Sequence, residues 1–160
     1  EGGGSRELEA LAPVELVDGV LESQVALLDE VQQLHAGRQG VAAGDAHDQA
    51  EVCLRHVIEA VERIQDYVDG MSLEEFLADS KTSDATLRNL EIIGEAARLV
   101  PENVTSLHEH VPWGDMRAMR NVVAHEYDRV NVRTVWDTVH NDLPPLVPLL
   151  LQLLEQELEA

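Results

Sequence analysis

The chain has 160 residues, which is enough for one domain with a substantial hydrophobic core and too few for two. It is 44% hydrophobic but only 3% aromatic, and a core of leucine, valine and alanine suits helix packing better than a pleated sheet. Its 31 acidic and 11 basic side chains give a formal net charge of -20, which excludes general binding to nucleic acid or anionic membranes unless positive charge is concentrated locally. The sequence therefore predicts an all-α fold.

The cysteine count and the hydropathy pattern bear on disulfides, metal binding and membrane insertion. The single cysteine, Cys53, excludes an intrachain disulfide and a multi-cysteine metal site. No apolar run reaches the roughly 18 residues that span a bilayer, and no basic start precedes an apolar stretch as a secretory signal requires. We therefore expect a cytoplasmic protein that holds no metal or cofactor and does not associate with a membrane.

The N-terminal part is predicted to consist of a tail, a helix and a linker. Residues 1–13 begin with EGGGSR, which is typical of a flexible linker or a processing remnant. Residues 14–36 carry apolar side chains at steps of three and four, which predicts an amphipathic helix that needs a partner surface. Its apolar positions are Val14, Val17, Leu21, Val25, Leu28, Val31 and Leu34. Residues 37–48 are rich in glycine and alanine and lack periodicity, so we expect a linker there.

The main domain is predicted to occupy residues 49–160 and to open with a helix that ends at Gly70. A short helix through Leu77 follows, because Ser72 and Glu75 in SLEE have the spacing of a capping box. The apolar positions of the first helix are Val57, Val61, Ile64 and Val68.

The third helix of this domain is predicted from Ser83 to Val100, where Pro101 stops it. Its buried positions are expected to be Leu87, Leu90, Ile93, Ala97 and Val100. Gly94 lies inside this helix, where glycine costs about 1 kcal/mol relative to alanine. Close approach of another helix is a reasonable explanation, so we expect a helix crossing at Gly94.

The remaining helices are predicted over residues 102–109, over residues 113–127 and from Asn131 onward, with Asn131 as the N-cap. Three prolines interrupt the last of these helices, because each lacks an amide donor and clashes with the preceding turn. They are Pro144, Pro145 and Pro148. We expect a break or a strong kink after Leu143.

The stretch RNVVAHEYD at residues 120–128 carries the side chains best suited to chemistry. His125 follows Arg120 by five residues, and Tyr127 follows it by seven. On a regular α-helix Arg120 and His125 lie roughly 140° apart around the axis, so one helix cannot aim both at the same atom. Either the helix ends or distorts before His125, or the two side chains meet across an interface between two copies of the chain.

These residue types suit cleavage of a phosphodiester bond in RNA without a metal ion. Arginine carries a permanent planar charge that grips two phosphate oxygens, and histidine titrates near neutral pH and can take or give a proton. The substrate 2′-hydroxyl would attack phosphorus while His125 takes or gives the proton. Arg120 would stabilise the negative charge of the pentacovalent phosphorus. Asn121 can orient the phosphate or the imidazole. Spacing alone is a weak argument, because an arginine and a histidine five residues apart also occur by chance on solvated helix faces.

Longer stretches around the motif are similar to a known family. MRNVVAHEY resembles the R-x4-H motif of the HEPN superfamily, and its extension R-x4-H-x-Y resembles that of HepT-type toxins. TSDATLRNLEIIGEAARLVP, VPWGDMRAMRNVVAHEY and VWDTVHNDLPPL also resemble that family, so the similarity covers about residues 50–155. The predicted helix at 14–36 departs from the family pattern, which starts near residue 49.

The resemblance implies an all-α HEPN-type helical bundle, here with an extra N-terminal helix, that forms a homodimer with the two motifs facing a shared cleft. It implies an endoribonuclease toxin of a type VII-like toxin–antitoxin pair, with Arg120 and His125 as catalytic residues and RNA as substrate. A minimal nucleotidyltransferase antitoxin is implied to neutralise it by transferring AMP to Tyr127, which would place charge and bulk beside Arg120. Glu95 resembles an acidic position that can line the cleft, and the alternatives for it are a solvated face or an arginine partner.

The charge around the motif suits this function better than the charge of the whole chain. From His110 to Val135 there are four arginines and three acidic residues, so a narrow substrate such as a structured RNA end or loop fits better than generic RNA. Two alternatives stay open. One is a non-catalytic HEPN module that binds nucleotide or docks a nucleotidyltransferase, and the other is a pure scaffold.

Overall fold

The chain folds into a bundle of helices, and the computed structural model describes its backbone over residues 43–125 and 131–159 and its side chains over 46–120 and 131–158. The helices are α2 (Ala43–Val68), α3 (Leu73–Ala78), α4 (Ser80–Leu99), α5 (Glu102–Leu107), α6 (Trp113–His125), α7 (Val132–Asp137), a π-helical turn (Thr138–Asp142) and α8 (Leu143–Glu159). No strand occurs in this part of the chain, which confirms the all-α prediction. The helix expected at 14–36 lies outside the described residues.

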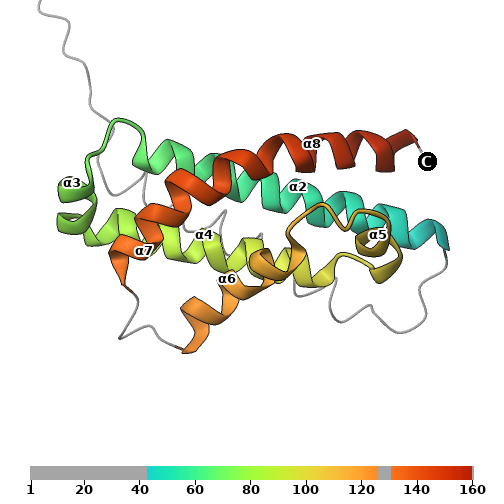
Figure 1. Ribbon diagram of the computed structural model, residues 1–160, viewed down its shortest axis with the longest axis horizontal. Coiled ribbons are helices and arrows are strands. Elements are labelled where there is room, and N and C mark those ends of the chain that lie inside the picture. The colour runs from blue at the N-terminus through green and yellow to red at the C-terminus, as the bar shows by residue number, and fades with distance from the viewer. Residues whose placement is uncertain (1–42, 126–130, 160) are drawn as a thin grey trace, which may run out of the picture.

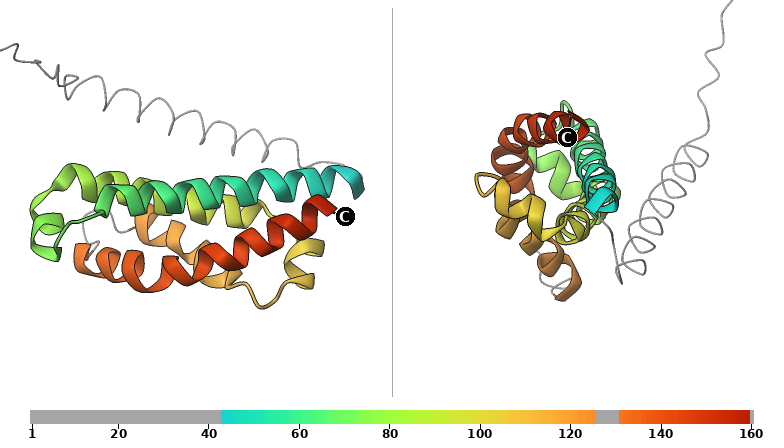
Figure 2. Two further views of the ribbon diagram at one scale, coloured as in Figure 1. Left: turned by 90° about the horizontal axis from the view of Figure 1, so that it is seen from above. Right: turned by 90° about the vertical axis from the view of Figure 1, so that its right-hand side faces the viewer.

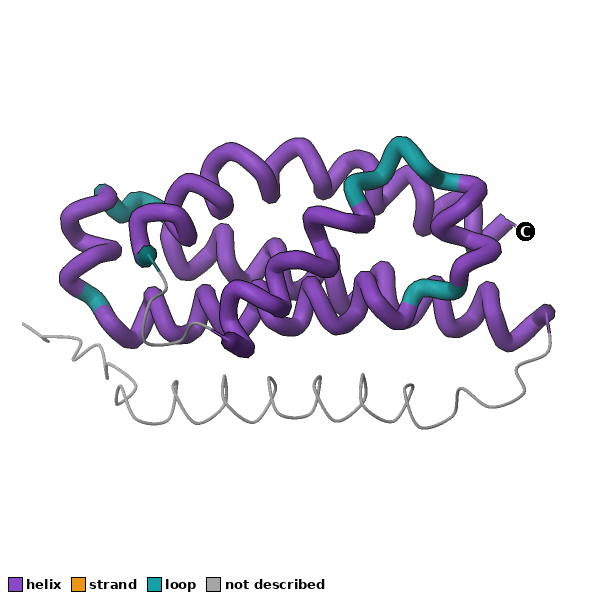
Figure 3. The backbone as a smooth tube through the Cα atoms, turned by 60° about the horizontal axis from the view of Figure 1, so that its bottom comes forward, coloured by secondary structure: helices purple, strands orange, loops and turns teal. Residues whose placement is uncertain are grey.

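The long helices α2 and α4 run antiparallel through the middle of the bundle (Figure 1). α8 packs along α2 and α6 packs across α4, while α3 and α7 lie together at one end of the bundle. The end-on view of Figure 2 shows that the helices surround a common interior, and Figure 3 shows that the described loops lie toward the two ends. No helix in the described ranges is both long and apolar enough to cross a membrane.

Hydrophobic periodicity predicts the core of the bundle correctly. Every apolar position predicted for the helices before Gly70 and before Pro101 is buried. Cys53 is fully buried as well, as are the large side chains Leu54, Ile64, Phe76, Ile93, Met116 and Leu150. The helix α2 ends as expected, because Gly70 takes the left-handed φ of 70° that a helix-terminating glycine permits.

The predicted linker over residues 37–48 is wrong in its last part, because α2 begins at Ala43. Two contacts with distant segments hold this start in place. His47 Nδ1 lies 2.7 Å from Glu157 Oε2 of α8, and Gln49 Nε2 donates a hydrogen bond of 3.0 Å to the Leu99 carbonyl at the end of α4. Neither partner is near in sequence, so local composition does not reveal where this helix begins.

Side-chain caps set the starts of three helices. The capping box predicted from Ser72 and Glu75 is present at α3. Asn131 caps α7 as expected, by accepting a hydrogen bond from the second amide of that helix. Asp79 caps α4 in the same way, so α4 begins at Ser80, earlier than predicted.

The break expected after Leu143 is wrong, because α8 begins at that residue and continues through Pro148. The departure from α-helical geometry comes just before it, in the π-helical turn Thr138–Asp142. A π turn is wider than an α turn. It therefore relieves the crowding of the preceding carbonyls by the rings of Pro144 and Pro145, which also lack amide donors.

The helix crossing predicted at Gly94 is confirmed. A Cβ atom built on Gly94 of α4 would lie 2.6 Å from the backbone nitrogen of Arg120 and 2.7 Å from its Cβ. Both distances are far shorter than a van der Waals contact, so only glycine lets α6 approach α4 this closely. The contact fixes the height of Arg120 along α4.

Replacing Gly94 by alanine should lower the free energy of unfolding by about 1–3 kcal/mol, because α6 must move away from the added methyl group. Helix propensity alone predicts the opposite sign, a gain of about 1 kcal/mol. The matched control is Gly114→Ala, since a Cβ at Gly114 meets nothing within 4 Å. Urea denaturation of both variants measures the difference, and a Gly94→Ala protein as stable as the wild type would show that the helices are not in contact here.

Candidate active site

Arg120 is held on the surface of the bundle by a carboxylate from the neighbouring helix. Its Nε lies 3.0 Å from Oε2 of Glu95, which follows the crossing residue Gly94 on α4. The Glu95 side chain is only 14% exposed whereas that of Arg120 is 45% exposed, so the carboxylate is enclosed while the guanidinium reaches solvent. The pair uses the Nε edge of Arg120, and the terminal Nη nitrogens have no hydrogen-bond partner among the described residues.

Arg98 is a second partner of the same carboxylate. Its Nη2 lies 2.5 Å from Glu95 Oε1 and its Nε lies 3.2 Å from Glu95 Oε2. The hydrogen bond to Glu95 raises the pKa of the Arg98 guanidinium above its already high ordinary value, so Arg98 is permanently charged. Among the described residues, this cluster holds two arginines and one carboxylate, so that part of it is net positive. Of the alternatives for Glu95, an arginine partner is confirmed and a solvated face is wrong.

The backbone of α6 shows whether the helix continues between Arg120 and His125. α6 is α-helical from Trp113 to His125, so the chain does not leave the helix between Arg120 and His125. Their Cα atoms are therefore roughly 140° apart around one axis, and the alternative in which the helix ends before His125 is wrong. Asn121 lies in the same helix. Tyr127 lies outside the described residues.

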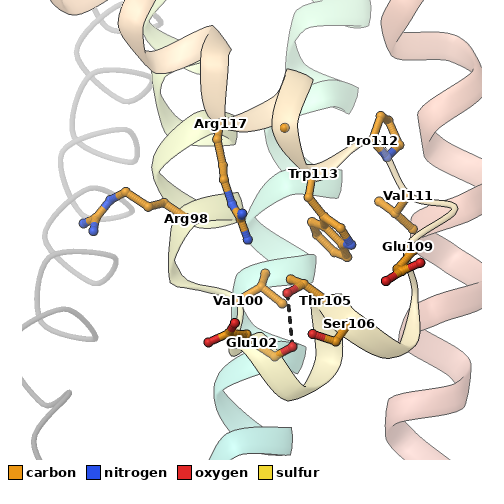
Figure 4. A pocket seen from close by; sticks show the side chains of 11 residues that line it. Arg98, Val100, Glu102, Thr105, Ser106, Glu109, Val111, Pro112, Trp113 and Arg117 are labelled. Atoms are coloured by element: carbon orange, nitrogen blue, oxygen red, sulfur yellow. Dashed lines mark hydrogen bonds between the residues drawn. The ribbon is translucent and has the colours of Figure 1, made fainter.

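A hollow of about 700 Å³ opens beside the cluster, between α5 and the first turns of α6 (Figure 4). Arg117 reaches into it from α6, between Arg98 and Trp113. Its Nε donates a hydrogen bond of 3.3 Å to the carbonyl of Ala97 on α4. No carboxylate in the described part of the chain lies within ion-pair distance of Arg117.

Two residues of this site were not singled out by the sequence. Arg98 follows Glu95 by three residues, a spacing that allows an ion pair on a helix face. Arg117 precedes Arg120 by three residues and is one of the four arginines between His110 and Val135. The pattern R-x-x-R on a helix that crosses a glycine is the signal that could have identified Arg117.

Arg117 and Arg120 place two guanidinium groups on the exposed face of α6. Guanidinium groups are suited to binding phosphate oxygens. The guanidinium of Arg120 reaches solvent, and the carboxylate of Glu95 that it bonds is shared with Arg98. Among the described residues no cluster of three histidine, cysteine, aspartate or glutamate side chains is arranged to hold a metal ion.

Comparisons with known proteins agree with the chemistry of this site. The family model described as "Ribonuclease HepT-like" matches residues 57–153. The chain is 42% identical over 93 residues to "Probable ribonuclease HepT" of Thermococcus cleftensis, which covers 58% of this chain and 84% of that protein. It is 36% identical over 104 residues to a protein of Caldanaerobacter subterraneus subsp. tengcongensis named "Putative RNase", covering 65% of this chain and 93% of the relative.

A similarly named protein of Methanocaldococcus jannaschii is 37% identical over 91 residues, covering 57% of this chain and 75% of the relative. No solved structure matches the chain significantly. The matched residues run from within α2 through most of α8 and include the crossing of α4 with α6.

Proposed function

The chain belongs to the ribonuclease HepT-like family, and on this premise we propose that it is a metal-independent endoribonuclease in which Arg120 grips the phosphate of the cleaved linkage. The observation that carries the proposal is the bond between Glu95 and Arg120. It occupies Nε, and among the described residues the Nη pair of this exposed guanidinium has no partner, so we propose that this pair faces a ligand. Two parallel N–H donors match two phosphate oxygens.

The proposed reaction is attack by the 2′-hydroxyl of RNA on the adjacent phosphorus. The P–O bond to the 5′-oxygen of the next nucleotide breaks, which leaves a 2′,3′-cyclic phosphate. His125 accepts the 2′-hydroxyl proton, and the departing 5′-oxygen takes a proton from the imidazolium so formed or from water. Negative charge rises on the phosphate oxygens in the pentacovalent transition state, and Arg120 stabilises that charge. Asn121 is proposed to orient the phosphate or the imidazole.

The site is proposed to be completed by a second copy of the chain. One continuous helix carries Arg120 and His125 on different sides, so one protomer cannot direct both at one phosphorus. A twofold axis perpendicular to α6 would bring Arg120 of one protomer toward His125 of its partner, because the two copies of α6 then run in opposite directions. Glu95 acts as a positioning residue in this scheme, since it touches the arginine and not the substrate.

Regulation is proposed to act on the same face. In the proposed toxin–antitoxin pair, a minimal nucleotidyltransferase transfers AMP from ATP to Tyr127, forming a phosphodiester at the phenolic oxygen and releasing pyrophosphate. Tyr127 follows Arg120 by seven residues, so on a helical path it would lie near the side of Arg120. The added phosphate would compete with RNA for that guanidinium.

Cleavage of RNA should depend on both residues of the motif. We expect Arg120→Ala to lower kcat about 10²- to 10³-fold, as does loss of one preorganised donor, and His125→Ala to lower it about 10²- to 10⁴-fold. Glu95→Gln should lower kcat with little change in KM, because RNA still binds but the guanidinium is less well oriented. Cleavage of a fluorescently labelled RNA in the presence of a chelator measures these effects.

The matched control for Glu95 is Glu91→Gln, which removes a carboxylate that bonds Arg88 three residues away on the same helix. This variant should cleave RNA like the wild type. If purified wild-type protein cuts no RNA, and Arg120→Ala and His125→Ala relieve no toxicity in cells, the enzyme assignment fails and the non-catalytic HEPN module takes its place.

Neutralisation should require the phenol of Tyr127. After incubation with the partner nucleotidyltransferase and ATP, tandem mass spectrometry should place AMP on Tyr127, and cleavage should cease. Tyr127→Phe should stay active and escape neutralisation, whereas Tyr67→Phe, a change on α2, should be neutralised normally. Full neutralisation of a chain whose Tyr127 is unmodified would refute this mechanism.

A further inference from the structure

The hollow between α5 and α6 is chemically different at its two sides. Arg117 enters it from α6, next to Arg98, and no described carboxylate pairs with Arg117. The lining from α5 and the loop after it includes the hydroxyls of Thr105 and Ser106 and the carboxylates of Glu102 and Glu109 (Figure 4). A cation on one side and oxygen acceptors on the other suit a ligand that has an anion at one end and N–H donors at the other.

Arg117 is tied to the proposed cleavage site by the geometry of α6. It precedes Arg120 by three residues, so the two side chains leave the helix about 60° apart and are separated by about 4.5 Å along its axis. Both also bond α4, Arg117 through Ala97 and Arg120 through Glu95. Two anchored arginines one turn apart can hold successive phosphates of a single RNA strand.

Hydrogen bonds hold part of the wall of the hollow in place. The Trp113 side chain is 6% exposed, and its indole nitrogen donates a hydrogen bond of 3.0 Å to the His108 carbonyl. The Thr105 hydroxyl bonds the Glu102 carbonyl at 3.2 Å. Ser106 and Glu109 are exposed at the surface of the lining, where a ligand can reach them. The indole edge is therefore committed to the fold, and the groups left for a ligand on this side include the Ser106 hydroxyl and the carboxylates of Glu102 and Glu109.

These features distinguish a nucleotide from a bare phosphate chain. A polyanion that filled the hollow would meet the carboxylates of Glu102 and Glu109, whereas a nucleotide places its phosphate at Arg117 and its base at the far side. A carboxylate accepts hydrogen bonds from the exocyclic amino groups of bases. Uracil has no exocyclic amino group, and its N3–H donor lies between two carbonyl oxygens that a carboxylate repels.

We propose that this hollow is a nucleotide subsite that holds the residue next to the cleaved linkage, with Arg117 on its phosphate and Glu109 on the edge of an amino-bearing base. The inference rests on the proposed ribonuclease function, because it names the part of the substrate that lies beside Arg120. It predicts that cleavage is disfavoured where uracil occupies this position.

The test compares Arg117→Gln with Arg133→Gln, a matched change of an exposed arginine on α7 away from this hollow. The probe is a 2′-O-methyl RNA hexamer, which cannot be cleaved by its own 2′-oxygen, titrated at two salt concentrations. Arg117→Gln should raise Kd about 5- to 10-fold and flatten the dependence of log Kd on log salt by about one phosphate contact. Arg133→Gln should bind like the wild type.

Arg117→Gln also removes the bond of Arg117 to α4 and could disturb the fold, so a second variant tests the subsite independently. Glu109 is exposed, so Glu109→Gln should fold normally, and its effect is read by sequencing the products of a random RNA pool. Wild-type protein should avoid uracil at one position beside the cut, and Glu109→Gln should lose that avoidance. If both arginine variants bind alike, or if the base profile is unchanged in Glu109→Gln, the subsite is refuted.

The same experiments separate this inference from the function it rests on. Arginine-dependent binding of the hexamer by a wild-type protein that cuts no RNA would leave the subsite standing and remove the ribonuclease. Cleavage that needs Arg120 but does not change in the Arg117 and Glu109 variants would support the ribonuclease and refute the subsite.

Discussion

The close contact of α4 and α6 at Gly94 is the constraint on which the rest of this structure depends. Because glycine has no side chain, the backbone of Arg120 lies against α4 and cannot slide along it. The next residue, Glu95, is then within reach of the Arg120 guanidinium. One backbone contact thus sets both the packing of the helix and the position of the group proposed to bind phosphate.

A strongly acidic protein can present a cationic site when its arginines are concentrated and only partly paired. Over the ranges that the structure describes, the carboxylate of Glu95 bonds both Arg98 and Arg120, and Arg117 adds a further charge with no carboxylate within ion-pair distance. The net charge of -20 still opposes long RNA at a distance. Such a site favours short or structured RNA segments whose phosphates contact the arginines directly, and its affinity falls with rising salt.

Most of the fold and part of the site follow from local sequence patterns. Periodicity identifies the buried faces, and the unfavourable glycine at 94 correctly predicts a helix crossing. Local patterns do not show that α2 begins six residues before Gln49, since a contact between His47 and Glu157 stabilises that start. Nor do they show which arginine Glu95 bonds, because the pairing with Arg120 exists only once two helices have packed.

Mixing two inactive variants tests most directly the claim that Arg120 and His125 meet across a twofold interface. Equimolar Arg120→Ala and His125→Ala protomers, exchanged until native mass spectrometry shows heterodimers, contain one intact cleft in each heterodimer. The account predicts that cleavage returns to about a quarter of the wild-type rate, since half of the dimers are mixed and half of their clefts are complete. Heterodimers that form but cut no RNA would contradict it.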